Sequence, residues 1–141
     1  MNLSVYLFSR KTGSYLYGGP NSHLFKGAGH HNSFCKWNII SMGDNMVVLQ
    51  CAANDHFLNA TGPNLTRKWL SSDEDNNFYL RWRIVEKGSN EVVLQSVQTN
   101  AYLNAGPNVT PRHIREFIRG EEDSNPFLRW NIELINIQYL F

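Results

Sequence analysis

Three short polar segments hold most of the side chains that could recognise a ligand. Residues 29–33 contain two histidines and an asparagine, and residues 73–77 and 121–125 are rich in Asp, Glu and Asn. Carboxylates accept hydrogen bonds and amides both donate and accept, so these segments suit the hydroxyl groups of a sugar. A single segment of this kind is more simply a solvated loop. Two equivalent acidic segments favour binding modestly over that interpretation.

Enzymes and metal sites need patterns that this sequence lacks. It has no Gly-x-Ser-x-Gly elbow and no phosphate-binding loop, so we expect no enzyme activity. The His30–His31 pair lacks the spacing of a zinc site, and the nearest further donors are His23 and Cys35. We therefore expect neither a metal nor a cofactor.

The chain has two cysteines, Cys35 and Cys51. A hairpin turn at 42–45 would set them almost opposite each other on neighbouring strands, which makes a disulfide conceivable. The absence of a secretory leader instead favours two reduced, buried thiols.

An internal repeat indicates which elements must position these side chains. Residues 3–21, 46–64 and 91–108 each combine a β-rich run, a polar turn, an aromatic–Leu pair and Gly-Pro-Asn. A second signature closes each repeat with Trp, a polar residue and Ile, and it contains Trp37, Trp82 and Trp130. The repeats therefore run about 1–45, 46–90 and 91–141.

The pattern within a repeat predicts strands. β-branched and aromatic residues recur between Gly, Asn, Asp and Pro, the rhythm of an all-β chain. Residues 43–45 and 88–90 are predicted hairpin turns, because Gly and Asn tolerate positive φ. A helix could start after Pro111, but we expect residues 111–123 to form strand and loop, because their counterparts in the other repeats are strands.

Three four-stranded units, each closing on a Trp strand, resemble the β-trefoil, in which six strands form a barrel and three hairpins cap one end. This resemblance covers the whole chain and predicts a single all-β domain, 1–141, with pseudo-threefold symmetry. An immunoglobulin-like sandwich is the alternative, and it would not explain the threefold period. Nine recurring residues are the predicted core: Trp37, Trp82, Trp130, Leu7, Leu49, Leu94, Leu16, Leu58 and Leu103.

Charge and composition argue against several classes of binding partner. The formal net charge of +1 over 141 residues gives no electrostatic reason to expect nucleic acid or an anionic membrane as a partner. No apolar run of about 18 residues is present, so no membrane insertion is expected. The N-terminus does not read as a secretory signal, which predicts a cytoplasmic protein or one released without a classical signal peptide.

The repeat layout is similar to that of small single-domain trefoil lectins, of agglutinin and ricin-B type, from fungi and invertebrates. This resemblance implies glycans as partners and an agglutinin-like role in defence. The Gln that ricin-type lectins carry two residues before Trp is replaced here, by Cys35, Leu80 and Leu128. The number of working sites and the existence of a homodimer stay open.

The layout predicts three carbohydrate sites, each pairing a Gly-Pro-Asn turn with the loop before the next Trp strand. The first would contain Tyr17, Asn21, His30 and Asn32. The second would contain Asn59, Asn64, Asp75 and Asn76, with Trp69 as a stacking face. The third would contain Asn104, Asn108, Asp123 and Asn125. Three weak sites would gain strength from multivalency.

Two other functions are left open by the fold. A trefoil protease inhibitor would use the longest loop, 112–126, with Arg115 and Arg119 as contacts. A cytosolic module of the actin-binding kind is the third alternative.

Overall fold

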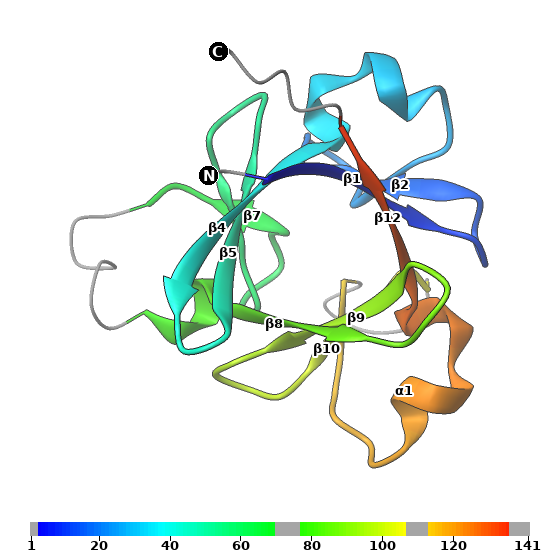
Figure 1. Ribbon diagram of the computed structural model, residues 1–141. Helices are drawn as coiled ribbons and strands as arrows, with labels where there is room; N and C mark the ends of the chain where they lie inside the picture. The colour runs from blue at the N-terminus through cyan, green and yellow to red at the C-terminus, as the bar shows by residue number, and fades with distance from the viewer. Residues whose placement is uncertain (1–2, 70–76, 107–112, 136–141) are drawn as a thin grey trace, which may run out of the picture.

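The computed structural model describes residues 3–69, 77–106 and 113–135 (Figure 1). Six strands close into a barrel through antiparallel pairing, in the order β1–β4–β5–β8–β9–β12 and back to β1. Their bounds are Leu3–Ser9 for β1, Lys36–Gly43 for β4, Met46–Cys51 for β5, Trp82–Glu86 for β8, Glu91–Ser96 for β9 and Trp130–Leu134 for β12.

Three short hairpins complete the repeats. They pair β2 (Ser14–Leu16) with β3 (Leu24–Phe25), β6 (Phe57–Leu58) with β7 (Thr66–Arg67), and β10 (Tyr102–Leu103) with β11 (Ile114–Arg115). Each repeat thus contributes four strands, two to the barrel and two to a hairpin. This is the predicted β-trefoil architecture.

The barrel hairpins turn where the sequence predicted. Asp44, Asn45, Ser89 and Asn90 all have positive φ, and each turn opens with a glycine of φ 80° or 83°. A positive φ raises the backbone energy of most residues, and Gly, Asn and Asp adopt it at the lowest cost.

The predicted core is confirmed. All nine recurring Trp and Leu residues are fully buried. Each indole Nε1 donates to a Leu carbonyl oxygen of its own repeat: Trp37 to Leu16 at 3.1 Å, Trp82 to Leu58 at 3.1 Å and Trp130 to Leu103 at 3.2 Å. Each indole also removes roughly 150–250 Å² from water, which favours folding by several kcal/mol. The tryptophans therefore join each hairpin to the barrel.

The segments before the Trp strands form short helical turns, where loops were expected. These are η1 (Gly29–His31), η2 (Ser33–Cys35), η4 (Phe78–Leu80), α1 (Glu121–Ser124) and η5 (Pro126–Leu128). An asparagine caps one turn in each repeat, because Asn32, Asn77 and Asn125 accept the backbone N–H two residues ahead. The stretch 111–123 contains the expected strand β11, but it also enters α1, which sequence analysis missed.

The two cysteines are free and buried, as expected. The register differs slightly from the predicted one, since Cys51 lies opposite Trp37 and Cys35 ends η2 just before β4. Burial, with a smaller effect of Cys51, raises the pKa of Cys35 to about 11. Within the described part of the chain, no helix has the length and apolar character that crossing a membrane requires.

Candidate functional site

A pocket of about 570 Å³ lies on the outside of the barrel in repeat 2, and we call it the repeat 2 pocket. Ligand pockets commonly have volumes of roughly 300–1,000 Å³. Its wall comes from the β4–β5 barrel hairpin, from the turn before β6 and from the residues that follow β7. The lining consists of Ile40, Met42, Val48, Gln50, Asn54, Asp55, His56, Phe57, Lys68 and Trp69.

An aromatic pair forms one wall of the repeat 2 pocket. The rings of Phe57 and Trp69 lie 5.0 Å apart between centroids, tilted by 57°. Strand pairing sets this geometry, because Phe57 lies opposite Arg67 and the chain reaches Trp69 two residues later. Both rings are half-buried, so part of each remains available to a ligand.

Two amides of the lining are already engaged with the backbone. Gln50 Nε2 donates to the carbonyl oxygen of Asp55 at 3.2 Å. Asn54 Nδ2 donates to the Gly18 carbonyl oxygen, and its Oδ1 accepts the N–H of His56. These bonds hold the turn in shape. The rim also carries the polar side chains of Asp55, His56 and Lys68.

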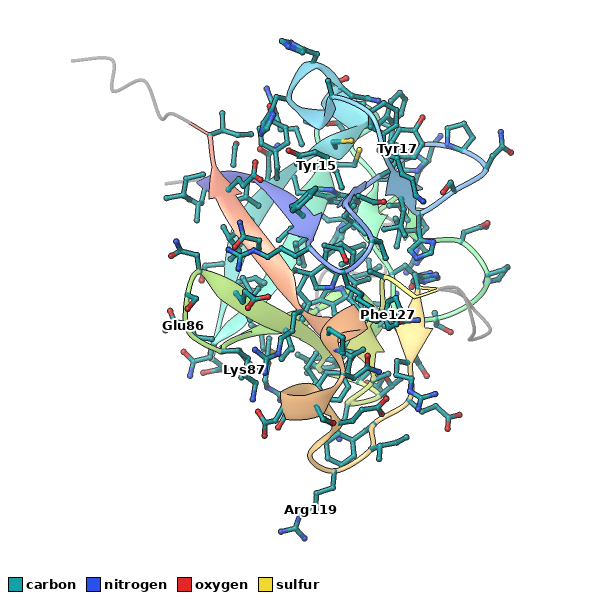
Figure 2. The ribbon with its side chains drawn as sticks, turned by 90° about the vertical axis from the view of Figure 1, so that its right-hand side faces the viewer. Tyr15, Tyr17, Glu86, Lys87, Arg119 and Phe127 are labelled. Carbon is teal, nitrogen blue, oxygen red and sulfur yellow. The ribbon has the colours of Figure 1, made fainter. Side chains whose placement is uncertain are left out.

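The corresponding place in repeat 1 is filled by the protein itself. The ring of His30 lies 4.8 Å from that of Tyr6 and 5.3 Å from that of Tyr15. Its Nε2 is 2.6 Å from Glu133 Oε2 on β12. Burial, followed by the charge of Glu133, raises the pKa of the Tyr15 hydroxyl. Figure 2 shows Tyr15 close to the segment that contains η1 and η2.

In repeat 3, α1 fills the corresponding place. The Tyr102 hydroxyl donates to Glu122 at 2.5 Å. Lys87 Nζ lies 3.6 Å from the same carboxylate and 3.1 Å from Asp123, beside α1 (Figure 2). Burial first, and the bond to Glu122 second, raise the pKa of Tyr102. Repeats 1 and 3 thus carry an internal side chain at the place where the described residues beside the repeat 2 hairpin line a pocket.

The structure separates the members of the predicted first site. Tyr17 stacks on Phe25 at 5.5 Å, whereas His30 packs on Tyr15 and Tyr6. Asn32 caps η2. Asn21 instead lines a second pocket of about 650 Å³, together with Asn64 of repeat 2. The Gly-Pro-Asn turns of repeats 1 and 2 therefore line one pocket together.

The other predicted residues divide in a similar way. Asn59 and Asn104 are 4% exposed, and each side chain bonds the backbone two residues ahead. Asn125 caps η5 and donates to Glu121 at 2.7 Å, and Asp123 is exposed beside Lys87. A sugar contact by any of them stays a prediction. Three more predicted residues lie outside the described residues: Asp75, Asn76 and Asn108.

Histidines link the hairpins around the pseudo-threefold axis at the second pocket. His23 Nε2 lies 3.1 Å from the Asn104 carbonyl oxygen, and His113 Nε2 lies 3.1 Å from that of Asn59. Leu65 occupies the matching place in repeat 2. Burial lowers the pKa of His113 to about 4, so its ring is neutral and donates from Nε2. Among residues 3–69, 77–106 and 113–135, no group of three or more His, Cys, Asp or Glu side chains could hold a metal ion.

Sequence reasoning did not name Phe57 of repeat 2 or Phe117 of repeat 3 as site residues, although each belongs to an aromatic pair beside its hairpin. Phe117 is 50% exposed and lies 6.0 Å from Tyr102, the counterpart of Phe57. A signal was present, because Arg67-Lys68-Trp69 and Arg115-Glu116-Phe117 share the order Arg, charged residue, aromatic residue.

Comparison with known proteins gives a fold and no family. No family model and no curated protein matches the sequence. The designed threefold-symmetric protein ThreeFoil matches with a TM-score of 0.69 at 12% identity, over 92% of this chain and 96% of ThreeFoil. SeviL, solved with asialo-GM1 saccharide bound, matches at 0.67 and 11%, over 94% of this chain and 98% of SeviL.

A toxin shares the same architecture. The cytolethal distending toxin of Haemophilus ducreyi matches with a TM-score of 0.68 at 12% identity, over 98% of this chain and 87% of that chain. Identities this low support no inference about activity. The closed barrel, its three hairpins and these structural matches together show that this chain has the β-trefoil fold.

Proposed function

We propose that the protein is a non-catalytic carbohydrate-binding protein that takes a sugar in the repeat 2 pocket. The observation that carries this proposal is the half-buried Trp69 ring, supported from behind by Phe57 and bordered by Asp55, His56 and Lys68. An aromatic face packs on the apolar face of a pyranose, while charged and polar groups at the rim bond its hydroxyls.

The structural neighbours support this function as an analogy. SeviL is solved with asialo-GM1 saccharide, and a Polyporus squamosus lectin is solved with a sialylated epitope. Both share the fold with this chain at 11–12% identity. Because trefoils host unrelated activities, the proposal rests on the repeat 2 pocket, and the structural neighbours give it additional support.

The proposal involves one site, where sequence analysis predicted three. His30 occupies the corresponding place in repeat 1 and Glu122 that in repeat 3. A sugar entering either place would first have to displace a bonded internal side chain. Among the described residues, no side chain is bonded across the repeat 2 pocket in this way.

Trp69 provides a direct measurement. It is one of four tryptophans, and the other three are fully buried in the core. A sugar that stacks on Trp69 should change intrinsic fluorescence and reduce acrylamide quenching. A glycan array would first identify the ligand, and fluorescence titration would then give its affinity.

Two matched variants decide whether the site lies in repeat 2 or in repeat 3. Trp69→Ala should weaken binding at least tenfold, because it removes the stacking face. Phe117→Ala removes the counterpart ring in repeat 3 and should leave affinity unchanged. Loss of binding in Phe117→Ala with retention in Trp69→Ala would move the site to repeat 3. Folded protein that binds nothing across broad glycan panels would refute the proposal.

A second candidate function rests on the loop after β11. Arg115 is committed to Glu121, with Nε 3.0 and 3.3 Å from the two carboxylate oxygens, which pins the base of the loop. Phe117 and Ile118 are about half exposed, and Arg119 projects from the body at the tip (Figure 2). Aromatic residues and Arg are enriched at protein interfaces, so this tip suits a protein partner.

Protease inhibition is the form of this second function that can be tested at once. If the tip enters an enzyme cleft, the protein should inhibit one of the trypsin-like, papain-like or aspartic proteases, and Arg119→Ala should abolish the inhibition. Full protease activity at saturating protein in all three classes would remove this candidate.

A further inference from the structure

The three pseudo-equivalent places differ systematically in chemistry. Each place lies between a hairpin and the Trp strand of the preceding repeat around the barrel. Three residues after the tryptophan of that strand stand Glu133 beside the repeat 1 hairpin, Val85 beside the repeat 3 hairpin and Ile40 beside the repeat 2 hairpin. Five residues after it stand Ile135, Lys87 and Met42, in the same order. The aromatic residue of the hairpin is Tyr15, Tyr102 or Phe57.

Each polar member of this set holds an internal side chain. Glu133 bonds His30 at 2.6 Å in repeat 1. Lys87 and the Tyr102 hydroxyl approach Glu122 in repeat 3. Ile40, Met42 and Phe57 stand at these positions beside the repeat 2 hairpin, so each of the groups that bonds an internal side chain elsewhere is replaced here by an apolar one.

The residues at these positions give the repeat 2 pocket an apolar wall. The residues that correspond there to Glu122 and His30 are Glu74 and Asp75, which lie outside the described residues. The wall formed by Ile40, Met42 and Val48 suits a small apolar group.

We infer that the repeat 2 pocket selects a sugar bearing an acetamido group, an inference that rests on the proposed function. The acetamido methyl lies against Ile40, Met42 and Val48. Its amide carries one donor and one acceptor, and the rim offers both a carboxylate, Asp55, and an ammonium, Lys68. The pyranose ring packs on Trp69.

The apolar wall explains why an acetamido sugar should bind more tightly than its parent. The parent sugar has no methyl group to place against Ile40, Met42 and Val48, so it lacks that apolar contact. A 6-deoxy sugar offers a methyl without the amide and serves as the discriminating competitor.

Titration of matched sugars tests the inference. Trp69 fluorescence and calorimetry would compare N-acetylgalactosamine with galactose, N-acetylglucosamine with glucose, and both pairs with L-fucose. At least one acetamido sugar should bind about tenfold more tightly than its parent. Parents that bind as tightly as acetamido sugars, or tighter binding of L-fucose, would overturn the inference and leave the proposed function standing. Absence of binding to every sugar would refute both.

Variants locate the selectivity. Met42→Lys introduces a lysine at the position that Lys87 holds beside the repeat 3 hairpin, and it should abolish the acetamido preference. Ser41→Lys adds the same charge to the neighbouring exposed residue, which does not line the pocket, and should keep the preference. Val48→Thr keeps the shape of the wall while adding a hydroxyl, and it should lower the preference without a new charge. An unchanged preference in both pocket variants, with native near-UV circular dichroism, would refute the assigned wall.

Discussion

His113 illustrates how one buried side chain links repeats 2 and 3. It is 2% exposed and donates to the Asn59 carbonyl oxygen. Burial opposes its protonation more than this bond favours it, so its pKa falls from 6.5 to about 4. Since the unfolded chain takes up a proton between these two pH values and the folded chain does not, stability decreases as pH falls through that window.

We expect His113 to lower the free energy of unfolding by about 3 kcal/mol between pH 6.5 and pH 4. Urea unfolding across this range would measure the slope, and His113→Leu should flatten it, since Leu65 already occupies the matching place in repeat 2. The exposed His31 supplies the control, because His31→Leu should leave the slope unchanged. Equal slopes in wild type and His113→Leu would contradict the assignment.

The two thiols should be inert in the folded protein. Cys35 and Cys51 are fully buried, and burial raises both pKa values, that of Cys35 to about 11. Because the thiolate is the reactive form, Ellman's reagent at pH 8 should label neither cysteine until denaturant is added, and then both. Rapid labelling of either thiol under native conditions would show that the barrel opens locally.

At the scale of elements, the indole bonds tie each hairpin to the barrel strand that follows it. Replacing Trp37, Trp82 or Trp130 with Phe leaves a buried Leu carbonyl oxygen without its donor and opens a small cavity. Each change should cost about 2–4 kcal/mol of unfolding free energy. Trp69→Phe should cost less than about 1 kcal/mol, since that ring is half-buried.

Chemical denaturation of the four variants would check these values. Similar losses at the three core positions would reflect their pseudo-equivalent environments. A core variant as stable as Trp69→Phe would show that its indole bond contributes little.

The fold was predictable because the same spacing recurs three times. Trp82 alone could belong to many structures, but Trp37 and Trp130 at matching places require a common environment. The hairpin turns at 43–45 and 88–90 were predictable for a local reason, since few residues accept their backbone angles. Helix α1 was not, because its four residues carry no apolar periodicity.

The candidate site was predictable only in part. Trp69, a predicted stacking face, lines the repeat 2 pocket, whereas the side-chain amides of Asn59 and Asn104, which were predicted to contact a sugar, bond the chain's own backbone. A sequence shows which groups can form hydrogen bonds and does not show which have already formed them. Phe117 was missed because the longer turn of repeat 3 shifts its spacing from Tyr102, and only the pairing of Tyr102 with Arg115 aligns it with Trp69.

For the whole molecule, barrel closure brings the two described ends of the chain together. β1 pairs with β12, and the Ile135 N–H donates to the Ser4 carbonyl oxygen at 3.0 Å (Figure 1). A circular permutant that joins residue 141 to residue 1 and opens between Ser89 and Asn90 should therefore fold, because the new ends lie in an exposed turn.

We expect this permutant to keep a native near-UV circular dichroism spectrum and the acrylamide protection of its core tryptophans. Its midpoint should fall by several degrees, because the two strands of one barrel hairpin are no longer joined. A chain opened inside β9 is the control and should fail to fold. Loss of native spectra in the turn permutant would mean that the covalent turn at 88–90, and not barrel closure, organises repeat 3.

The occupancy of the places in repeats 1 and 3 by His30 and Glu122 also bears on what one copy can do at a glycosylated surface. If the protein has the function proposed above, a molecule with one open place would mask a glycan but could not bridge two of them. Clumping of cells or precipitation of glycoproteins would then require two copies to be held together, and a lone copy would act as a competitor that blocks such lattices.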